Sequence, residues 1–321
     1  MTASHYRYVS PLSQRSRGVS VRVSGAWQGP APWIDHGRLA LVCEGGGQRG
    51  IFTAGVLDSF IEQHFLPFHI LIGASAGAQN LTAYACGARG YARHAIMRYT
   101  TGKEFIDPLR FARGGHLIDL DWYFDTLHQR APLDLDHARR RLAQRSFHVC
   151  ASRRDTLEAA YLPFDVASLR LSVKASSAVP FFYRGGVTYN DVVYWDGGVA
   201  DALPVRAAHA LGADCIVVVR TLPHASGLES APFSRKLPHK RLQEMASLVQ
   251  RHLTNHRAAM AFIERPPGSV KVIEIAPERP LLSRMLGSGV EALRQDYRSG
   301  QAAGRIFMNN VAWRLRHSSA G

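Results

Sequence analysis

The chain has 321 residues, of which 46% are hydrophobic and 20% are charged, and its formal net charge is +14 at pH 7. This composition supports a large folded core and excludes a disordered chain, and no run of about 20 apolar residues predicts a membrane span. The positive charge favours a phosphate-bearing partner, either nucleic acid or an anionic lipid surface. Because no zinc-finger spacing or aromatic single-strand-binding pattern accompanies the charge, we expect no nucleic-acid partner.

Residues 1–37 are rich in Ser, Arg, Gly and Pro and predict an irregular basic leader. They contain no apolar core followed by a small-residue cleavage site, so no secretory signal is predicted. The four cysteines lie far apart in the sequence and fit no metal-binding spacing, which favours buried, reduced thiols (Cys43, Cys86, Cys150 and Cys215). We therefore expect a cytoplasmic protein without a metal or other cofactor, free in solution or peripheral to the inner face of the membrane.

A first predicted strand, residues 38–44, leads into the glycine-rich loop Gly45-Gly46-Gly47-Gln48-Arg49-Gly50 and then into a helix. Three glycines at the start of a helix leave backbone N–H groups unhindered, and the helix dipole favours negative charge there. The Arg49 side chain either adds positive charge to this site or pairs with an acid such as Glu44. The loop also matches Gly-x-Gly-x-x-Gly, but no acidic residue ends the next strand, which disfavours dinucleotide binding.

The pentapeptide Gly73-Ala74-Ser75-Ala76-Gly77 follows a second buried strand (68–72) and precedes a predicted helix. Strand, sharp turn and helix are the context in which Gly-x-Ser-x-Gly exposes a nucleophilic serine, and the flanking glycines remove Cβ atoms that would collide in the turn. Two strand–loop–helix units in succession predict a parallel sheet with helices on its faces. Serine needs a base and an oxyanion stabiliser, and the preceding glycine loop is the natural stabiliser.

The segment from about 91 to 145 is predicted to be helical and rich in aromatic residues, and strands return at 146–151, 192–195 and 215–219. Its apolar side chains either line an acyl-binding groove or belong to the ordinary core, and we expect the core for most of them (Ile96, Met97, Tyr99, Phe105, Phe111, Trp122, Tyr123 and Phe124).

The base is predicted to be Asp196, which ends an apolar strand and is followed by Gly197 and Gly198. These glycines allow close approach of another backbone or a substrate, so the carboxylate could accept the Ser75 proton directly. Downstream histidines lack a comparable setting. His252 and His256 share a helix face without the Glu of a zinc motif, so we expect packed or exposed side chains there.

After residue 221 the sequence predicts a basic, proline-containing linker, a helix over 240–263, a strand over 270–275 and a final helix over 290–316. The last helix carries apolar residues among arginines and either packs on the rest of the protein, which we favour, or rests on a membrane surface. We therefore predict a leader (1–37), a catalytic domain (38–221) and a C-terminal helical extension with one strand (222–321).

The glycine loop 45–50, the Ser75 pentapeptide and the Asp196-Gly197-Gly198 triplet, in this order, resemble the three sequence blocks of the patatin-like phospholipase family. Residues 175–182 (Ala-Ser-Ser-Ala-Val-Pro-Phe-Phe) are similar to a fourth block, and the resemblance covers about 38–221. The chain as a whole resembles a bacterial branch with a C-terminal extension. Many family members have Asp where this chain has Glu44.

The resemblance implies a three-layer α/β/α fold with a mostly parallel sheet, plus a smaller, mainly helical C-terminal element. It also implies a Ser–Asp dyad, with Ser75 as nucleophile and Asp196 as base, an oxyanion hole made by Gly45, Gly46 and Gly47, and supporting roles for Arg49, Gly50, Gly73, Gly77, Gly197 and Gly198. The expected reaction is hydrolysis of acyl esters of phospholipid or lysophospholipid. Two alternatives stay open: an acyltransferase that uses the same acyl-serine, and a non-catalytic lipid- or protein-binding member of the fold.

Overall fold

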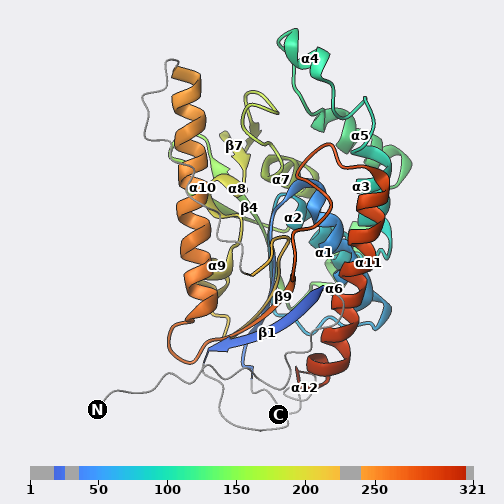
Figure 1. Ribbon diagram of the computed structural model, residues 1–321, viewed down its shortest axis with the longest axis vertical. Coiled ribbons are helices and arrows are strands. Elements are labelled where there is room, and N and C mark those ends of the chain that lie inside the picture. Colours follow the sequence, from blue (N-terminus) through green and yellow to red (C-terminus); the bar gives the residue numbers. More distant parts are fainter. Residues whose placement is uncertain (1–17, 26–35, 225–239, 316–321) are drawn as a thin grey trace.

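The computed structural model describes residues 18–25, 36–224 and 240–315 (Figure 1). Most of the predicted leader (1–17 and 26–35) and most of the proline-containing linker (225–239) lie outside these ranges. No helix within the described ranges is long and apolar enough to span a membrane.

The described residues form one sheet of nine strands in the order β1-β9-β8-β2-β3-β4-β7-β6, with β5 paired to β4. The five central strands are parallel: β9 (Lys271–Pro277), β8 (Cys215–Val219), β2 (Leu39–Cys43), β3 (Ile70–Ala74) and β4 (Ser146–Arg153). The flanking strands are antiparallel to their neighbours: β1 (Val19–Gly25), β5 (Ala159–Pro163), β6 (Val187–Tyr189) and β7 (Val192–Asp196). The predicted α/β class with a mainly parallel sheet centre is confirmed.

Helices cover both faces of the sheet because the central strands are apolar on both sides. On one face, Leu39 and Leu41 pack in a core with helices α1 (Gly50–Glu62), α2 (Ala76–Ala85) and α11 (Val290–Phe307). On the other face, Ala40 and Val42 pack with helices α9 (Val205–Ala210) and α10 (Lys240–Glu264). Figure 1 shows α9 and α10 on one side of the sheet and α1 and α11 on the other. The predicted three layers are therefore present.

The remaining helices lie mostly around the carboxyl ends of the parallel strands. They are α3 (Tyr91–Tyr99), α4 (Pro108–Ala112), α5 (Leu120–Arg130), α6 (Leu135–Arg141), α7 (Leu169–Ser176), α8 (Gly198–Asp201) and the short α12 (Trp313–Leu315). A 3₁₀ turn (Gly47–Arg49) precedes α1, and a π-helical segment (Met308–Ala312) follows α11. Helices α4 and α5 stand at one end of the molecule, beyond the edge of the sheet (Figure 1).

The C-terminal part of the chain is built into the same core as the predicted catalytic domain. Strand β9 pairs with β8, and α11 lies directly on α1. The helices approach so closely that a Cβ atom added to Gly300 would collide with the Phe52 carbonyl oxygen, and one added to Gly55 would collide with the Tyr297 carbonyl oxygen. The division at residue 221 stays a prediction.

One local expectation is wrong and another is confirmed. The prediction of an irregular leader is wrong for residues 19–25, because the alternating residues Val19 and Val21 are buried and β1 pairs with β9. In the final helical segment, Phe307, Val311 and Leu315 are buried in the core, whereas Trp313 is 40% exposed. This segment packs on the rest of the protein, as we favoured, and its apolar face is not left free for a membrane.

Candidate active site

Ser75 sits at a sharp turn between β3 and α2, with backbone angles φ 50° and ψ −123°. A positive φ is strained for a residue with a Cβ atom and persists only where the surrounding structure holds it. Here the turn is packed too tightly for larger residues at its two glycines. A Cβ atom on Gly73 would lie 2.7 Å from the Gly77 carbonyl carbon, and one on Gly77 would collide with the Cys43 carbonyl oxygen.

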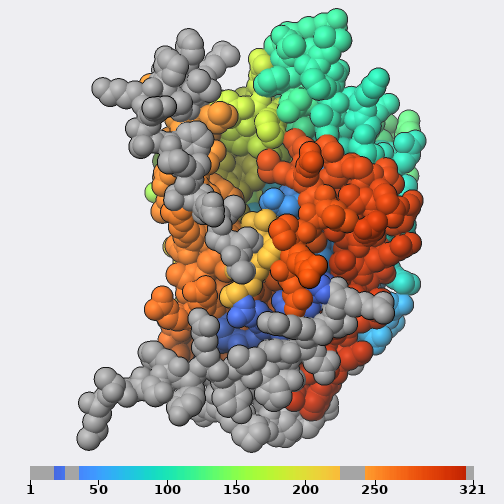
Figure 2. All heavy atoms as spheres, viewed as in Figure 1, coloured from blue at the N-terminus to red at the C-terminus, as the bar shows by residue number. Residues whose placement is uncertain are grey.

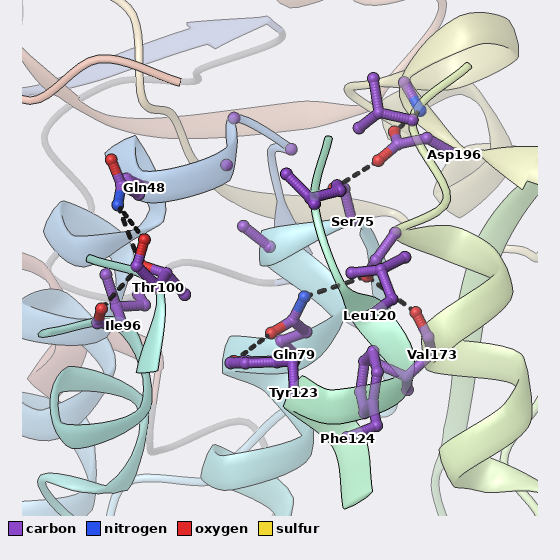
Figure 3. A pocket seen from close by; sticks show the side chains of 18 of the residues that line it. Gln48, Ser75, Gln79, Ile96, Thr100, Leu120, Tyr123, Phe124, Val173 and Asp196 are labelled. Carbon is purple, nitrogen blue, oxygen red and sulfur yellow. Dashed lines mark hydrogen bonds between the residues drawn. The ribbon is translucent and has the colours of Figure 1, made fainter. Parts of the chain in front are cut away.

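The Ser75 hydroxyl donates a hydrogen bond to Asp196, with 2.6 Å between Oγ and Oδ2 (Figure 3). Asp196 is the last residue of β7, and its other oxygen accepts the Gly198 N–H at 2.7 Å. Burial raises the pKa of Asp196 to about 6, although the hydrogen bonds from Ser75 and Gly198 act in the opposite direction. The carboxyl group is therefore mostly ionised at pH 7 but close to its titration range.

Residues 175–182, which resemble the fourth family block, form hydrogen bonds to the backbone of both Ser75 and Asp196. The Ser176 hydroxyl accepts the Ser75 N–H at 2.7 Å and donates to the Cys150 carbonyl at 2.5 Å. The Asp196 N–H donates to the Ala178 carbonyl at 2.9 Å. The sequence identified this block as a motif but gave no role to Ser176. Ser176 lies 101 residues after Ser75 in the chain, and their hydrogen bond depends on the tertiary fold.

The other aspartates near this region have different surroundings. Asp191 is exposed in the turn between β6 and β7. Asp201 accepts a hydrogen bond from the Tyr161 hydroxyl at 2.8 Å, and Asp214 accepts the Arg38 N–H at 2.8 Å. Of these carboxylates, Asp196 is the one that contacts Ser75.

The glycine loop lies beside Ser75 but does not present all three of its first amides. The Gly45 N–H donates to the Ala202 carbonyl at 3.0 Å, so the expectation that Gly45 donates to an oxyanion does not fit this geometry. The N–H groups of Gly46 and Gly47 donate to no acceptor in the part of the chain that the structure describes. Gly50 packs against the start of α2, where an added Cβ atom would lie 2.8 Å from the Ala76 Cβ.

Glu44 and Arg49 do not form the ion pair that we considered. The Glu44 carboxylate accepts the Thr221 N–H at 2.6 Å and a hydrogen bond from His256 Nε2 at 2.9 Å. Arg49 instead lines the cavity at Ser75, and its buried Nε has no hydrogen-bond partner within the described ranges. Burial lowers the pKa of Arg49, with the charge of Glu44 opposing this. Arg49 thus adds positive charge beside the glycine loop.

His252 of α10 is a cavity residue that sequence reasoning missed. Its Nδ1 lies 2.6 Å from the Gly198 carbonyl oxygen, so Nδ1 carries the proton and donates. Gly198 in turn donates its N–H to Asp196. Burial lowers the pKa of His252, which favours the neutral ring. The sequence showed only that His252 and His256 share one helix face. It could not show that His252 reaches the cavity, because this depends on how α10 packs against α8.

The cavity that contains Ser75 and Asp196 has a volume of about 570 Å³. Its walls are mainly apolar, with Phe105, Leu120 and Phe124 on one side and Met245 and Leu248 of α10 on another. In Figure 2 a group of blue atoms from the early part of the chain is visible in a hollow between α10 (orange) and the red-orange C-terminal segments. Of the eight apolar residues considered for an acyl groove, four line this cavity (Ile96, Phe105, Tyr123 and Phe124).

Within the cavity, Gln79 and Tyr123 form a polar contact below Ser75. The Tyr123 hydroxyl donates to Gln79 Oε1 at 2.8 Å, and Gln79 Nε2 donates to the Ser177 hydroxyl at 2.9 Å (Figure 3). The polar atoms of these side chains are therefore satisfied by one another, which leaves the apolar walls as the main surface offered to a ligand.

Two solved structures that this chain resembles are distant matches. VipD from Legionella pneumophila is 12% identical with a TM-score of 0.41, over 92% of this chain and 71% of VipD. The type III effector protein ExoU is 13% identical with a TM-score of 0.29, over 92% of this chain and 64% of ExoU.

Comparison of sequences gives closer matches. The uncharacterized protein YjjU of Escherichia coli (strain K12) is 49% identical over 280 residues, which is 86% of this chain and 78% of YjjU. Residues 242–316 match a domain of unknown function, DUF6363. Residues 41–209, more than half of the chain, match the family model described as patatin-like phospholipase. The chain therefore belongs to the patatin-like phospholipase family, a family of lipid hydrolases.

Proposed function

We propose that the protein is a serine acyl hydrolase that cleaves acyl esters of phospholipids or lysophospholipids through an acyl-serine intermediate. The observation that carries this proposal is the 2.6 Å hydrogen bond from Ser75 Oγ to Asp196 Oδ2 at the base of an apolar cavity. A serine hydroxyl becomes a competent nucleophile when an adjacent base removes its proton. Within the described residues, no histidine contacts Ser75, so the base in this proposal is the carboxylate alone.

The pKa of Asp196 suits this role. General bases work best when their pKa lies near the operating pH, and burial raises the pKa of this carboxyl group to about 6. A normal surface aspartate, with a pKa near 3.8, would be a weaker base by about two powers of ten. Burial therefore supplies basicity that a histidine provides in a triad.

The proposed oxyanion hole consists of the N–H groups of Gly46 and Gly47, the loop amides that lack an acceptor among the described residues. Gly47 adopts φ +57°, which turns the loop at this point and is unstrained only for glycine. Arg49 adds a positive charge to the same wall. Fixed donors of this kind stabilise the negative charge that develops on the carbonyl oxygen during attack.

The reaction follows from these positions. Asp196 accepts the Ser75 proton as Oγ attacks the ester carbonyl carbon, and the carbonyl oxygen becomes an oxyanion held by the loop amides. When the tetrahedral intermediate collapses, the ester C–O bond breaks and the departing alcohol takes the proton from Asp196. A water molecule then gives a proton to Asp196 while its oxygen attacks the acyl-serine. The C–Oγ bond breaks, Ser75 regains the proton, and the carboxylic acid is released.

The cavity supports a lipid acyl chain as the substrate group. Its volume of about 570 Å³ lies in the range of roughly 300–1,000 Å³ that small-molecule sites occupy. Apolar side chains such as Leu120, Phe124 and Val173 line the region next to Ser75 (Figure 3). An acyl chain can lose contact with water there without leaving polar groups of its own unpaired.

A hydrolysis assay on a panel of phospholipids and lysophospholipids tests the proposal. Ser75→Ala and Asp196→Asn should each lower turnover by roughly 10³-fold or more. Asp191→Asn is the matched control, since it removes an exposed carboxylate five residues earlier and should leave turnover unchanged. Full activity of Ser75→Ala would show that the nucleophile is wrongly assigned.

Two additions to this assay separate the alternatives. Acceptor alcohols in the reaction mixture distinguish hydrolysis from acyl transfer, because only transfer yields a new ester. A fluorophosphonate probe distinguishes an enzyme from a binding protein, because it labels an activated serine. If the probe leaves Ser75 unlabelled and no lipid is cleaved, the protein is a non-catalytic member of the fold.

A further inference from the structure

A second cavity, of about 490 Å³, lies between α3 and α11 and is lined by four arginine side chains. Arg93 comes from the first turn of α3, Arg89 comes from the turn just before this helix, and Arg294 and Arg298 come from α11. Arg294 and Arg298 are spaced by four residues and so lie on one face of α11. Tyr297 and Gln301 complete the wall, and we call this site the arginine pocket.

The acids around the arginine pocket balance only part of this charge. Arg89 pairs with Glu62 at 3.3 Å, and Arg294 pairs with Glu291 at 2.5 Å. Arg93 lies over the Tyr297 ring, 5.1 Å from its centroid. Neither Arg93 nor Arg298 has a carboxylate within ion-pair distance in the part of the chain that the structure describes. Arg93 and Arg298 therefore line the same cavity without a direct ion pair among the described residues, and the nearest acids, Asp58 and Glu291, interact with them only at longer range.

The buried carboxylate of Asp58 holds two lining residues of the arginine pocket, Gly90 and Tyr297, in place. This side chain accepts the Gly90 N–H at 2.9 Å and the Tyr297 hydroxyl at 2.7 Å, so it ties the start of α3 to α11. Burial raises the pKa of Asp58, with these hydrogen bonds and the nearby arginines opposing it. Both carboxylate oxygens of Asp58 accept hydrogen bonds from residues that line the arginine pocket, so we assign Asp58 a structural role there.

The amino end of α3 adds further positive potential. Helix α3 begins after Gly90, which lines the arginine pocket, and it has neither a side-chain cap nor an acidic residue in its first turn. The unpaired N–H groups and the helix dipole at such an end attract anions. Together with the guanidinium groups of Arg93, of Arg89 just before α3 and of the two arginines of α11, this arrangement favours a ligand with several negatively charged oxygens.

We propose that the arginine pocket binds a phosphate group, carried either by a small soluble molecule or by a lipid. Guanidinium groups donate paired hydrogen bonds whose geometry matches phosphate oxygens, and Arg93 and Arg298 are the two arginines of the pocket that form no ion pair among the described residues. The pocket is distinct from the catalytic cavity, yet the two share α3, whose residues Ala92, Ala95 and Ile96 line the catalytic cavity. A bound phosphate would thus lie one helix away from the proposed acyl-binding wall.

Binding measurements on the full chain test this site without relying on catalysis. Isothermal titration in about 0.15 M salt uses inorganic phosphate as the soluble probe. Flotation of the Ser75→Ala protein with phosphatidylcholine vesicles, with and without phosphatidic acid, is the lipid arm. The double variant Arg93→Gln/Arg298→Gln should weaken binding by roughly tenfold or more. The matched control Arg98→Gln/Arg305→Gln removes two exposed arginines from the same helices, outside the arginine pocket, and should bind as the wild type does.

Saturable binding of inorganic phosphate, lost in the first double variant alone, supports the site and assigns it to soluble phosphates. Binding only to phosphatidic acid vesicles, with the same dependence on Arg93 and Arg298, supports it and assigns it to lipid phosphates. Equal losses in both double variants would overturn the proposal, because general surface charge would then explain the binding. Absence of saturable binding to either probe would overturn it as well. A melting curve of each variant confirms that it is folded.

Discussion

Replacing Asp196 by asparagine is expected to stabilise the folded protein at neutral pH while it removes the proposed base. Asparagine keeps the shape of the side chain, and its carbonyl oxygen can still accept the Gly198 N–H that Asp196 accepts at 2.7 Å. Its amide group can donate to Ser75 Oγ, which reverses the direction of the 2.6 Å hydrogen bond. The substitution therefore changes mainly the buried negative charge.

The magnitude follows from the pKa of this carboxyl group. Burial raises the pKa from 3.8 to about 6. Each pH unit between the unfolded and folded pKa is worth about 1.4 kcal/mol, so ionised Asp196 costs about 3 kcal/mol of stability at pH 7. The folded state holds the proton more tightly, so this contribution to stability is full below pH 3.8 and is lost as the pH rises through about 6. For 321 residues, 3 kcal/mol corresponds to a rise in Tm of about 4–5 °C.

Thermal melts of wild type, Asp196→Asn and the surface control Asp191→Asn between about pH 4 and pH 8 measure this effect. The Tm of Asp196→Asn should exceed that of the wild type by several degrees at about pH 8, and the difference should vanish near pH 4. The control should follow the wild type throughout. A difference in Tm that does not depend on pH, or an Asp196→Asn protein that is less stable at pH 8, would refute the argument from buried charge.

Substitutions at three further positions probe the surroundings of the proposed dyad. Gly77→Ala should lower the free energy of unfolding in urea by about 1–3 kcal/mol, because its Cβ collides with the Cys43 carbonyl; an unchanged midpoint would contradict this. Burial alone would raise the pKa of Glu44, but hydrogen bonding and nearby positive charge lower it to about 2. Ionised Glu44 therefore stabilises the folded state by about 3 kcal/mol above pH 4.5, and this stabilisation is lost as the pH falls toward 2. Glu44→Gln should lower the free energy of unfolding in urea at pH 7 by this amount, and equal stability of the two proteins would contradict the argument. His252→Ala leaves the Gly198 carbonyl without its hydrogen-bond donor and should lower kcat roughly tenfold, whereas His252→Asn retains an N–H donor and should keep most of the activity. Equal kcat values for both variants would show that His252 does not position Gly198 and Asp196.

The central strands were predictable from the sequence because each is a short, largely apolar run, and because β2 leads into a glycine-rich loop and β3 into a helix. Strand β1 was not, although its alternating Val19 and Val21 carry the period of two that marks a half-buried strand. Its partner β9 lies about 250 residues later in the chain, so nothing in the neighbouring sequence indicates that this short segment has a strand to pair with. Short β5 and β6 were missed for a related reason, since their pairing with β4 and β7 depends on tertiary contacts.

The candidate site divides in the same way. Ser75 and Asp196 could be brought together from the order of motifs, since each stands where a strand ends and glycines allow close packing. The sequence could not show that the Gly45 amide already has an acceptor in Ala202, because that contact joins the loop to a segment about 160 residues away. It also could not place His252 in the cavity, because this depends on where α10 crosses the sheet.

These contacts give the C-terminal segment a structural part in the cavity that contains Ser75 and Asp196. Helix α10 supplies Met245 and Leu248 to the cavity wall and a hydrogen bond to Gly198, and the loop before α11 supplies Met285, whose carbonyl accepts the Gln48 N–H at 2.9 Å. That bond fixes the glycine loop next to the two amides proposed as oxyanion donors. The region matched to the family model, 41–209, therefore holds both members of the proposed dyad but only part of the cavity wall, and the rest comes from the region matched to DUF6363, 242–316.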